Sequence, residues 1–310
     1  MTSHTPSYFM TTDTPYKLYL SRLSATGRRA IHSQLNSIAA MMSWPHDERE
    51  HNFTTIDYAL GLKLINMMQQ QGWSARYINR GITAIKGIVR IAVLSDIASE
   101  KQSLQLQALP RLRHGEHPGT PLSQVQIKSL FSQLNSDCSL IGKRDTLILT
   151  LFLGLGLRRS ELQYIRIEDI DSKITSLVIQ KGKGNKSRTC YIPKWVQQVI
   201  KGWLTIVNTD IGYLVCRVNK SGRILPAKSL TSSGIYKIVK MRLNMVDINA
   251  SPHDLRRTFI TRLLEQNVDL NTVRQMAGHA DIATTIMYDK RDHAAMQQAA
   301  SLLSYGKEGE

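Results

Sequence analysis

A short stretch near the C-terminus, Ser251–Lys290, holds side chains whose types and spacing suit work on a phosphate. Ser251 is a good helix N-cap and Pro252 suits the first helical position, so a helix is predicted to begin there. His253 and Arg256 are three residues apart and therefore share one face of its first turn. Cationic or donor side chains beside the free backbone N–H groups of a helix start favour phosphate binding.

The second half of the stretch is predicted to bring a histidine and a tyrosine to the same place. Gly278 is typical of the residue that ends a helix, here the one running through Thr272–Ala277. That stop leaves His279 on a turn, followed by a short helix over Ile282–Met287 that leads to Tyr288. The phenol of Tyr288 is a weak nucleophile at its usual pKa of about 10, so it needs several positive neighbours.

Residues earlier in the chain complete a set that can act on a phosphodiester. Arg158 follows Gly156 at a predicted helix junction, and with Arg256 it can grip two phosphate oxygens in planar, bidentate geometry. Glu161 lies one helical turn beyond Arg158 and can orient a cation. Lys183, on the tip of a Gly-rich hairpin, can protonate a leaving alkoxide if neighbouring cations lower its pKa. These cations can stabilise a five-coordinate phosphorus by themselves, so neither a metal ion nor a cofactor is expected.

Each of these residues also has an ordinary structural explanation. A single histidine at a helix end is more often a hydrogen-bond partner than a catalyst, and Tyr288 alone would be a partly buried core residue. Arg159 favours a salt bridge or a contact with a phosphate backbone, and Lys186 favours a contact in a groove. The joint pattern favours a site, because the ordinary explanations would all have to hold at once.

The charge of the chain favours a nucleic-acid partner. Its 310 residues suggest two domains, and its formal net charge is +16. Residues 1–113 carry 13 Lys and Arg against 7 Asp and Glu, and residues 114–310 carry 27 against 17. Since both halves are basic, a polyanion touched by both is indicated. A merely soluble basic protein is the alternative.

The cysteines favour a reducing compartment. Cys138, Cys190 and Cys216 lie far apart without C-x-x-C spacing, which argues against a disulfide framework and a zinc site. Cys190 is expected in the core. No N-terminal apolar run is long enough for a signal peptide or a membrane span. The predicted location is therefore a reducing cytoplasm, with no membrane partner.

The first half of the chain is predicted to form an all-helical DNA-binding domain of about four helices over 13–108, after an adaptable terminus at 1–12. Gly27 is expected to mark a break between two helices, and Thr54/Thr55 to cap the next one, which Gly72 ends. A further helix starts after Ser74. Its basic side chains form either a solvated face or a surface that contacts DNA. The residues predicted to contact DNA are Arg76, Lys86 and Arg90. Residues 109–121, rich in Pro, Gly and basic side chains, are predicted to be the linker.

The second half is predicted to be a mixed α/β domain over 122–290. Helical patterns cover 124–134, 144–155, 195–207 and 233–245. Two strands, 174–179 and 188–192, are expected to form an antiparallel hairpin around the turn 182–186. Residues 224–229 are expected to form a loop over the partner. A tail at 291–310 would carry a last amphipathic helix over 293–303. The predicted fold class is therefore mainly α with a small antiparallel β-sheet.

Four motifs in this order resemble the tyrosine recombinases of the phage integrase family, with lengths closest to its compact Xer-like members. They are GLGLRRSEL (154–162), GKGNKSR (182–188), HDLRRTF (253–259) and GHADIATTIMY (278–288). Together they are highly specific, whereas any one alone is weak. The resemblance implies a helical, SAM-like core-binding domain and a catalytic domain that form a clamp around DNA.

The resemblance also implies a role for each residue. Tyr288 would form a 3′-phosphotyrosyl link, and Lys183 would protonate the 5′ hydroxyl. Arg158, His253, Arg256 and His279 would activate the phosphate, with Glu161 in support. Contacts with DNA are expected from Arg159, Lys186 and Arg188. Four copies would act on two specific DNA sites through a Holliday junction, giving integration, excision or resolution, and the tail would dock on a neighbouring copy.

Two other functions remain open at this point. A type IB topoisomerase-like nicking-closing enzyme would share the chemistry without needing paired sites. A DNA-binding accessory protein with an inactive site is disfavoured, because every catalytic position is filled. The target sequence, the outcome of the reaction and the need for a partner recombinase or an accessory protein are not specified by the sequence.

Overall fold

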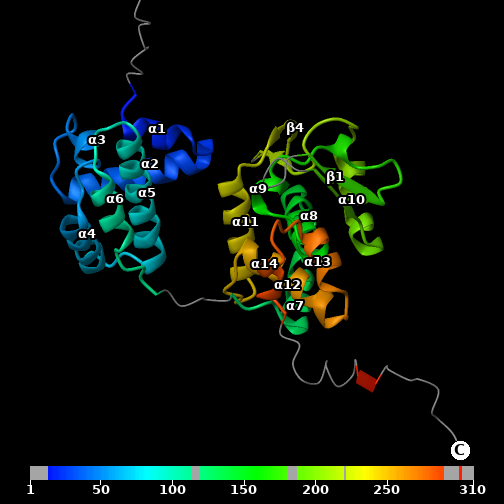
Figure 1. Cartoon of the computed structure of the whole chain (residues 1–310). Helices are drawn as coiled ribbons and strands as arrows, with labels where there is room; N and C mark the ends of the chain where they lie inside the picture. The colour runs from blue at the N-terminus through cyan, green and yellow to red at the C-terminus, as the bar shows by residue number, and fades with distance from the viewer. Residues whose placement is uncertain (1–12, 114–118, 181–186, 220, 290–299, 302–310) are drawn as a thin grey trace, which may run out of the picture. The chain divides into compact units, whose positions relative to one another are not determined.

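The chain divides into two compact units, Met1–His117 and Pro118–Glu310, which are described separately. In the computed structural model the described residues are 13–113, 119–180, 187–219, 221–289 and 300–301. Within them the chain is mainly helical with two small antiparallel sheets (Figure 1), which confirms the predicted fold class. No helix in these ranges is apolar over enough residues to cross a lipid bilayer.

The first unit is built around one long helix, α5. Its helices are α1 (Pro15–Ser21), α2 (Ala25–Met41), α3 (Arg49–Asn52), α4 (Tyr58–Gln70), α5 (Ala75–Leu94) and α6 (Glu100–Gln107). Helix α5 starts at the predicted cap, where the Ser74 hydroxyl accepts a hydrogen bond from the Tyr77 amide. It buries Ile78, Ile85 and Ile88 against α1, α2, α4 and α6. This spacing of apolar residues leaves the opposite face of α5 free for basic side chains.

Three expectations for this unit were wrong in detail. The described part holds six helices rather than about four, because α3 and α6 are short and weakly periodic. The cap of α4 is Asp57, whose carboxylate accepts from the Leu60 amide. The Thr54 and Thr55 hydroxyls instead donate backward to carbonyls of the preceding turn. The first break falls before Ser24, which caps α2, so Gly27 lies inside that helix.

The second unit is organised around α8 (Leu140–Leu155), which is buried over nearly all of its surface. It packs against α7 (Gln124–Ser136), α10 (Lys194–Val207), α11 (Ser232–Asn244) and α12 (Pro252–Glu265). Figure 1 shows α8 in the middle of this unit, between α10 and α11. A helix that is apolar all round must be covered on every side, which explains this central place. The remaining helical elements are α9 (Arg159–Leu162), the 3₁₀ turn Ile167–Asp169, α13 (Leu270–Ala277) and α14 (Ala283–Ile286).

Two hairpins complete the second unit. The predicted pair is present, since β1 (Ser176–Ile179) lies antiparallel to β2 (Arg188–Tyr191), with Leu177 opposite Cys190. Its turn and the tail helix lie outside the described residues, apart from 300–301 in the tail. The expectation of a loop at 224–229 was wrong, because these residues form strand β4 (Ile224–Ser229), which pairs with β3 (Cys216–Val218). Pro226 lacks an amide donor, but its carbonyl accepts from Tyr213, and a register shift accommodates it.

Candidate active site

The start of α12 forms as its sequence predicts. Pro252 is the first helical residue, and both the amide and the hydroxyl of Ser251 donate to the Asp254 carboxylate, at 2.9 and 2.7 Å. A carboxylate in the first turn also complements the positive end of the helix. This cap fixes the orientation of the first turn, which carries His253 and Arg256.

The second part of the site follows the end of α13. Gly278 ends this helix in the left-handed region, with φ +66, as predicted. His279 comes directly after this cap, and α14 then leads to Tyr288. Contacts between α12, α13 and α14 bring Tyr288 back to the start of the site.

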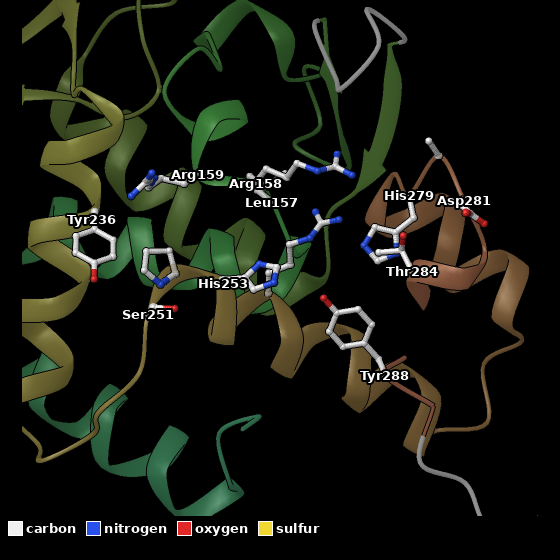
Figure 2. Close-up of a pocket in the computed structure, with 13 residues that line it drawn as sticks. Leu157, Arg158, Arg159, Tyr236, Ser251, His253, His279, Asp281, Thr284 and Tyr288 are labelled. Carbon is white, nitrogen blue, oxygen red and sulfur yellow. The ribbon is translucent and has the colours of Figure 1, made fainter. Parts of the chain in front are cut away.

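One cavity of about 460 Å³ collects five of the six predicted catalytic residues that the structure describes (Figure 2). They are Arg158, His253, Arg256, His279 and Tyr288. Figure 2 shows the Tyr288 hydroxyl pointing into the cavity, toward the space between His253 and His279. Glu161 lies behind the cavity wall, buried against Arg158. Residues more than a hundred positions apart therefore meet at one place.

Backbone carbonyls at two helix ends hold the arginines. Arg256 donates to the carbonyl of Gly156 at 2.5 Å and to that of Ala277 at 2.6 Å. Arg158 donates to the Gly278 carbonyl and, at 2.7 Å, to Glu161. A guanidinium has five N–H bonds, so each arginine keeps donors for a ligand beyond those it uses within the described ranges. The arginines are thus oriented by contacts within the protein itself.

Glu161 joins two arginines rather than one. Its carboxylate accepts from Arg158 and, at 2.7 and 2.8 Å, from both terminal nitrogens of Arg188. Burial alone would raise the pKa of Glu161, but the hydrogen bonds and charge of Arg188, with those of Arg158, lower the pKa to about 2. Arg188 was predicted to contact DNA. Its guanidinium lies against Glu161 at the back of the site, where it supports the carboxylate, and the contact with DNA stays a prediction.

Burial, together with the charges in the cavity, lowers two further pKa values. Burial, with the charge of Arg158, lowers the pKa of Arg256 to about 10, so its guanidinium stays protonated at neutral pH. Burial and the charges of Arg256 and Arg158 lower the pKa of His279 to about 4, so its imidazole is neutral there. The cavity therefore offers a positive field without a positive charge on His279.

Tyr288 is held between a cation and an imidazole. Its side chain is buried, and the Arg257 guanidinium lies 4.8 Å from the centre of its ring. The His279 ring stacks on it with centres 6.0 Å apart. Arg257 was not among the predicted site residues, although its place next to Arg256 on the same helix was a signal. Thr285 was also missed, although it precedes Tyr288 by one helical turn; its hydroxyl lies 2.8 Å from Nδ1 of His279.

The remaining predicted residues, the general acid and the DNA contacts, lie partly at the cavities and partly outside the described ranges. Lys183 and Lys186 lie outside the described residues. Arg159 lines the catalytic cavity and lies over the ring of Tyr236, 5.4 Å from its centre. In the first unit, Arg76 and Lys86 line a cavity of about 890 Å³ together with Arg80 and Arg111, whereas Arg90 is exposed outside that lining.

The cysteines and acidic residues add no metal centre in the part of the chain that is described. Cys190 is buried in the core, as predicted, Cys216 is also buried, and Cys138 is exposed. All three are free thiols. Within the described ranges, His, Cys, Asp and Glu side chains form no group of three or more suited to a metal ion.

A buried tyrosine facing two arginines and two histidines on this helical scaffold defines a tyrosine-type strand-transfer enzyme. Comparison with known proteins agrees, because residues 121–295 match the phage integrase family. The chain therefore belongs to the phage integrase family, and its enzyme class is that of the tyrosine-type site-specific recombinases.

Individual proteins support the same assignment. The chain is 30% identical over 232 residues to the tyrosine recombinase XerA of Pyrococcus furiosus, covering 74% of each chain. It is 30% identical over 238 residues to the tyrosine recombinase XerC of Pseudomonas aeruginosa, covering 76% of this chain and 74% of the relative. The fold resembles that of the Tn1549 transposon integrase in complex with transposon right end DNA. That match has a TM-score of 0.72 at 16% identity, over 93% of this chain and all of the other.

Proposed function

We propose that this protein cuts and rejoins DNA at specific sites, with Tyr288 as the nucleophile. The Tyr288 oxygen attacks the scissile phosphorus, and the phenol proton leaves to water in the open cavity. The bond from phosphorus to the 5′ oxygen breaks, and a 3′-phosphotyrosyl link remains. Reversal by a 5′ hydroxyl rejoins the strand without a nucleotide cofactor, since the link conserves the energy of the original bond.

The proposal rests on one observation, the Tyr288 hydroxyl pointing into a cavity lined by Arg158, Arg256, His253 and His279. Attack builds extra negative charge on the phosphate oxygens, and two pre-oriented guanidinium groups stabilise it. Because backbone carbonyls already hold both arginines, little reorganisation is needed when the charge develops. Lys183 is assigned the role of protonating the leaving 5′ oxygen, on the strength of the sequence motif.

Double-stranded DNA is the proposed substrate, held by both units. The Tn1549 integrase, whose fold this chain shares, carries DNA in its structure. The first unit offers a basic cavity with Arg76, Arg80, Lys86 and Arg111, which suits a phosphate backbone. We further propose that four copies act on two sites through a Holliday junction, in the bacterial cytoplasm. The relatives named above are recombinases, which does not favour the topoisomerase alternative.

The test is a covalent adduct. The wild-type protein is incubated with end-labelled duplex fragments that cover the DNA around its own gene, and SDS-resistant complexes are separated on a gel. Tyr288→Phe should bind the fragments but form no adduct. Tyr164→Phe, which removes an exposed hydroxyl, serves as the matched control and should form it at the wild-type rate.

Peptide mapping then assigns the nucleophile. Trypsin releases residues 275–290 as one peptide in which Tyr288 is the single tyrosine. A nucleotide mass on this peptide supports the proposal, whereas a nucleotide on Tyr236, the other phenol of the cavity, refutes it. Relaxation of any supercoiled plasmid, with adducts scattered along the DNA, would support the topoisomerase alternative instead.

A further inference from the structure

Thr285 makes a buried contact with a residue of the catalytic cavity. It lies in α14 and is fully buried, and its Oγ1 is 2.8 Å from Nδ1 of His279. His279 itself is 7% exposed and lines the cavity with Tyr288. Figure 2 shows its ring directed into the cavity from the α14 side. The hydrogen bond therefore joins the back of the ring to the protein and leaves Nε2 for the cavity.

The direction of this hydrogen bond follows from the partners of the hydroxyl. A threonine hydroxyl has one donor, and a neutral imidazole has one donor and one acceptor nitrogen. Among the described residues, no other hydrogen bond involves the Thr285 hydroxyl. If Nδ1 of His279 were the donor, the buried hydroxyl proton would have no acceptor, which is unfavourable by roughly tenfold or more. The hydroxyl must therefore donate, and Nδ1 must accept.

The charge state of the ring agrees with this direction. An imidazolium would carry protons on both nitrogens and could not accept from Thr285. Burial holds the pKa of His279 at about 4, and the neighbouring charges of Arg256, Arg158 and Arg188 act in the same sense. At neutral pH the ring is therefore neutral, and one of its nitrogens is free to accept.

We propose that Thr285 is a positioning residue that holds His279 as the Nε2–H tautomer and so makes it a hydrogen-bond donor in the cavity. An imidazole in this form has no lone pair toward the cavity, so it cannot act as the base for Tyr288. It donates instead to a phosphate oxygen, a consequence that rests on the proposed function. The tautomer itself does not rest on it, because the tautomer follows from the contact within the protein alone.

The tautomer can be measured directly on the full-length protein. Long-range ¹⁵N–¹H NMR distinguishes the two neutral forms of a histidine, and His279→Gln identifies the signals of this residue. Wild-type protein should show the Nε2–H form. Thr285→Val keeps the shape of the side chain but removes the donor. The ratio of the Nε2–H form to the Nδ1–H form should therefore fall by roughly tenfold.

A matched control uses the same substitution at another buried position. Thr150 in α8 is also fully buried, but its hydroxyl has no hydrogen-bond partner within the described ranges. Thr150→Val should leave the His279 spectrum unchanged. An Nδ1–H form in the wild type, or an unchanged tautomer ratio in Thr285→Val, would overturn the proposal.

The rate of adduct formation adds a second readout. Thr285→Val should slow the Tyr288 adduct roughly tenfold, and Thr285→Ser, which restores the hydroxyl, should recover most of the rate. If Thr285→Val and Thr285→Ser slow adduct formation equally, Thr285 acts through packing alone and the proposal is overturned. If no protein forms an adduct while the spectra show the Nε2–H form, the proposed function fails and the positioning role stands.

Discussion

Glu161→Gln should destabilise the 118–310 unit by about 3 kcal/mol at pH 7, and the difference should vanish in acid. Glu161 is almost fully buried and neutralises two arginines, Arg158 and Arg188. Glutamine has nearly the same shape but no charge. It would therefore leave both guanidinium groups in place without the carboxylate that compensates their burial.

The magnitude follows from the pKa. The folded protein lowers the pKa of Glu161 from 4.5 to about 2, chiefly through Arg188. One pKa unit corresponds to about 1.4 kcal/mol, so the preference for the charged form is worth about 3 kcal/mol. Because the folded pKa is the lower one, this stability is fully present above about pH 4.5. It is lost as the pH falls from there toward about 2.

Urea unfolding of the full chain at pH 7, 5 and 3.5 measures this effect. The chain has four Trp residues, so replacing Trp44 and Trp73 with Phe leaves Trp195 and Trp203 to report on the 118–310 unit. The free energy of unfolding should differ between Glu161 and Gln variants by the same amount at pH 7 and 5. At pH 3.5 the difference should be smaller.

An exposed ion pair supplies the control. Glu168 pairs with Arg166 at 2.8 Å, and the two side chains are 37% and 46% exposed. Exposed pairs of this kind contribute between zero and about 1 kcal/mol, so Glu168→Gln should be nearly silent. The reasoning about Glu161 fails if its variant loses no more stability than this control, or if the loss is the same at all three pH values.

Two further substitutions test the supports of the nucleophile and of the arginines. Arg257→Met removes the cation over the Tyr288 ring and should slow adduct formation about five- to thirtyfold. Arg257→Lys, which restores a cation, should recover part of the rate. An unchanged rate in Arg257→Met would contradict the role of this contact. Gly156→Ala should lower the free energy of unfolding by at least about 2 kcal/mol, because φ is +59 there and the new methyl would lie 2.2 Å from Phe259. Gly202 lies on α10 with open space around it, so Gly202→Ala should raise the free energy of unfolding by about 0.5–1 kcal/mol in the same urea measurement. A similar loss of stability in the Gly156 and Gly202 variants would refute the argument.

Local rules predicted the parts of the site that depend on neighbours in the chain. The start of α12 at Ser251 and the end of α13 at Gly278 both follow from residues within one turn. Caps of this kind are set by short-range hydrogen bonds, so a single sequence contains the needed information. The same rules misplaced the cap of α4, because Thr54, Thr55 and Asp57 all suit that role and only the packed structure selects one.

Contacts between distant segments could not be predicted in this way. Arg188 is 27 positions from Glu161, and it reaches from the first residue of β2 to a carboxylate in α9. From the sequence, an arginine on a basic hairpin is equally suited to DNA. The strand at 224–229 could not be predicted either, because it also depends on a contact with a distant segment. Pro226 disfavours a strand by itself, and only its partner β3 makes an edge position available.

Two glycines explain how the arginines of the site are placed. Gly156 ends α8 and Gly278 ends α13, and both adopt left-handed conformations that a side chain would strain. A helix that stops in this way leaves carbonyl groups at its C-terminus without partners in the helix. The carbonyls of Gly156, Ala277 and Gly278 are those that accept from Arg158 and Arg256.

This arrangement couples the fold to the chemistry. The carbonyls at a helix C-terminus carry partial negative charge, which offsets part of the cost of burying a guanidinium. Each arginine is bonded to a helix end distant in sequence: Arg256 joins the end of α8 to the end of α13, and Arg158 reaches from α9 to the end of α13. The two guanidinium groups that we propose to bind the phosphate are therefore aligned only when α8 and α13 are both folded and packed. A partly unfolded chain would lack the paired guanidinium groups on which the proposed nucleophile, Tyr288, depends.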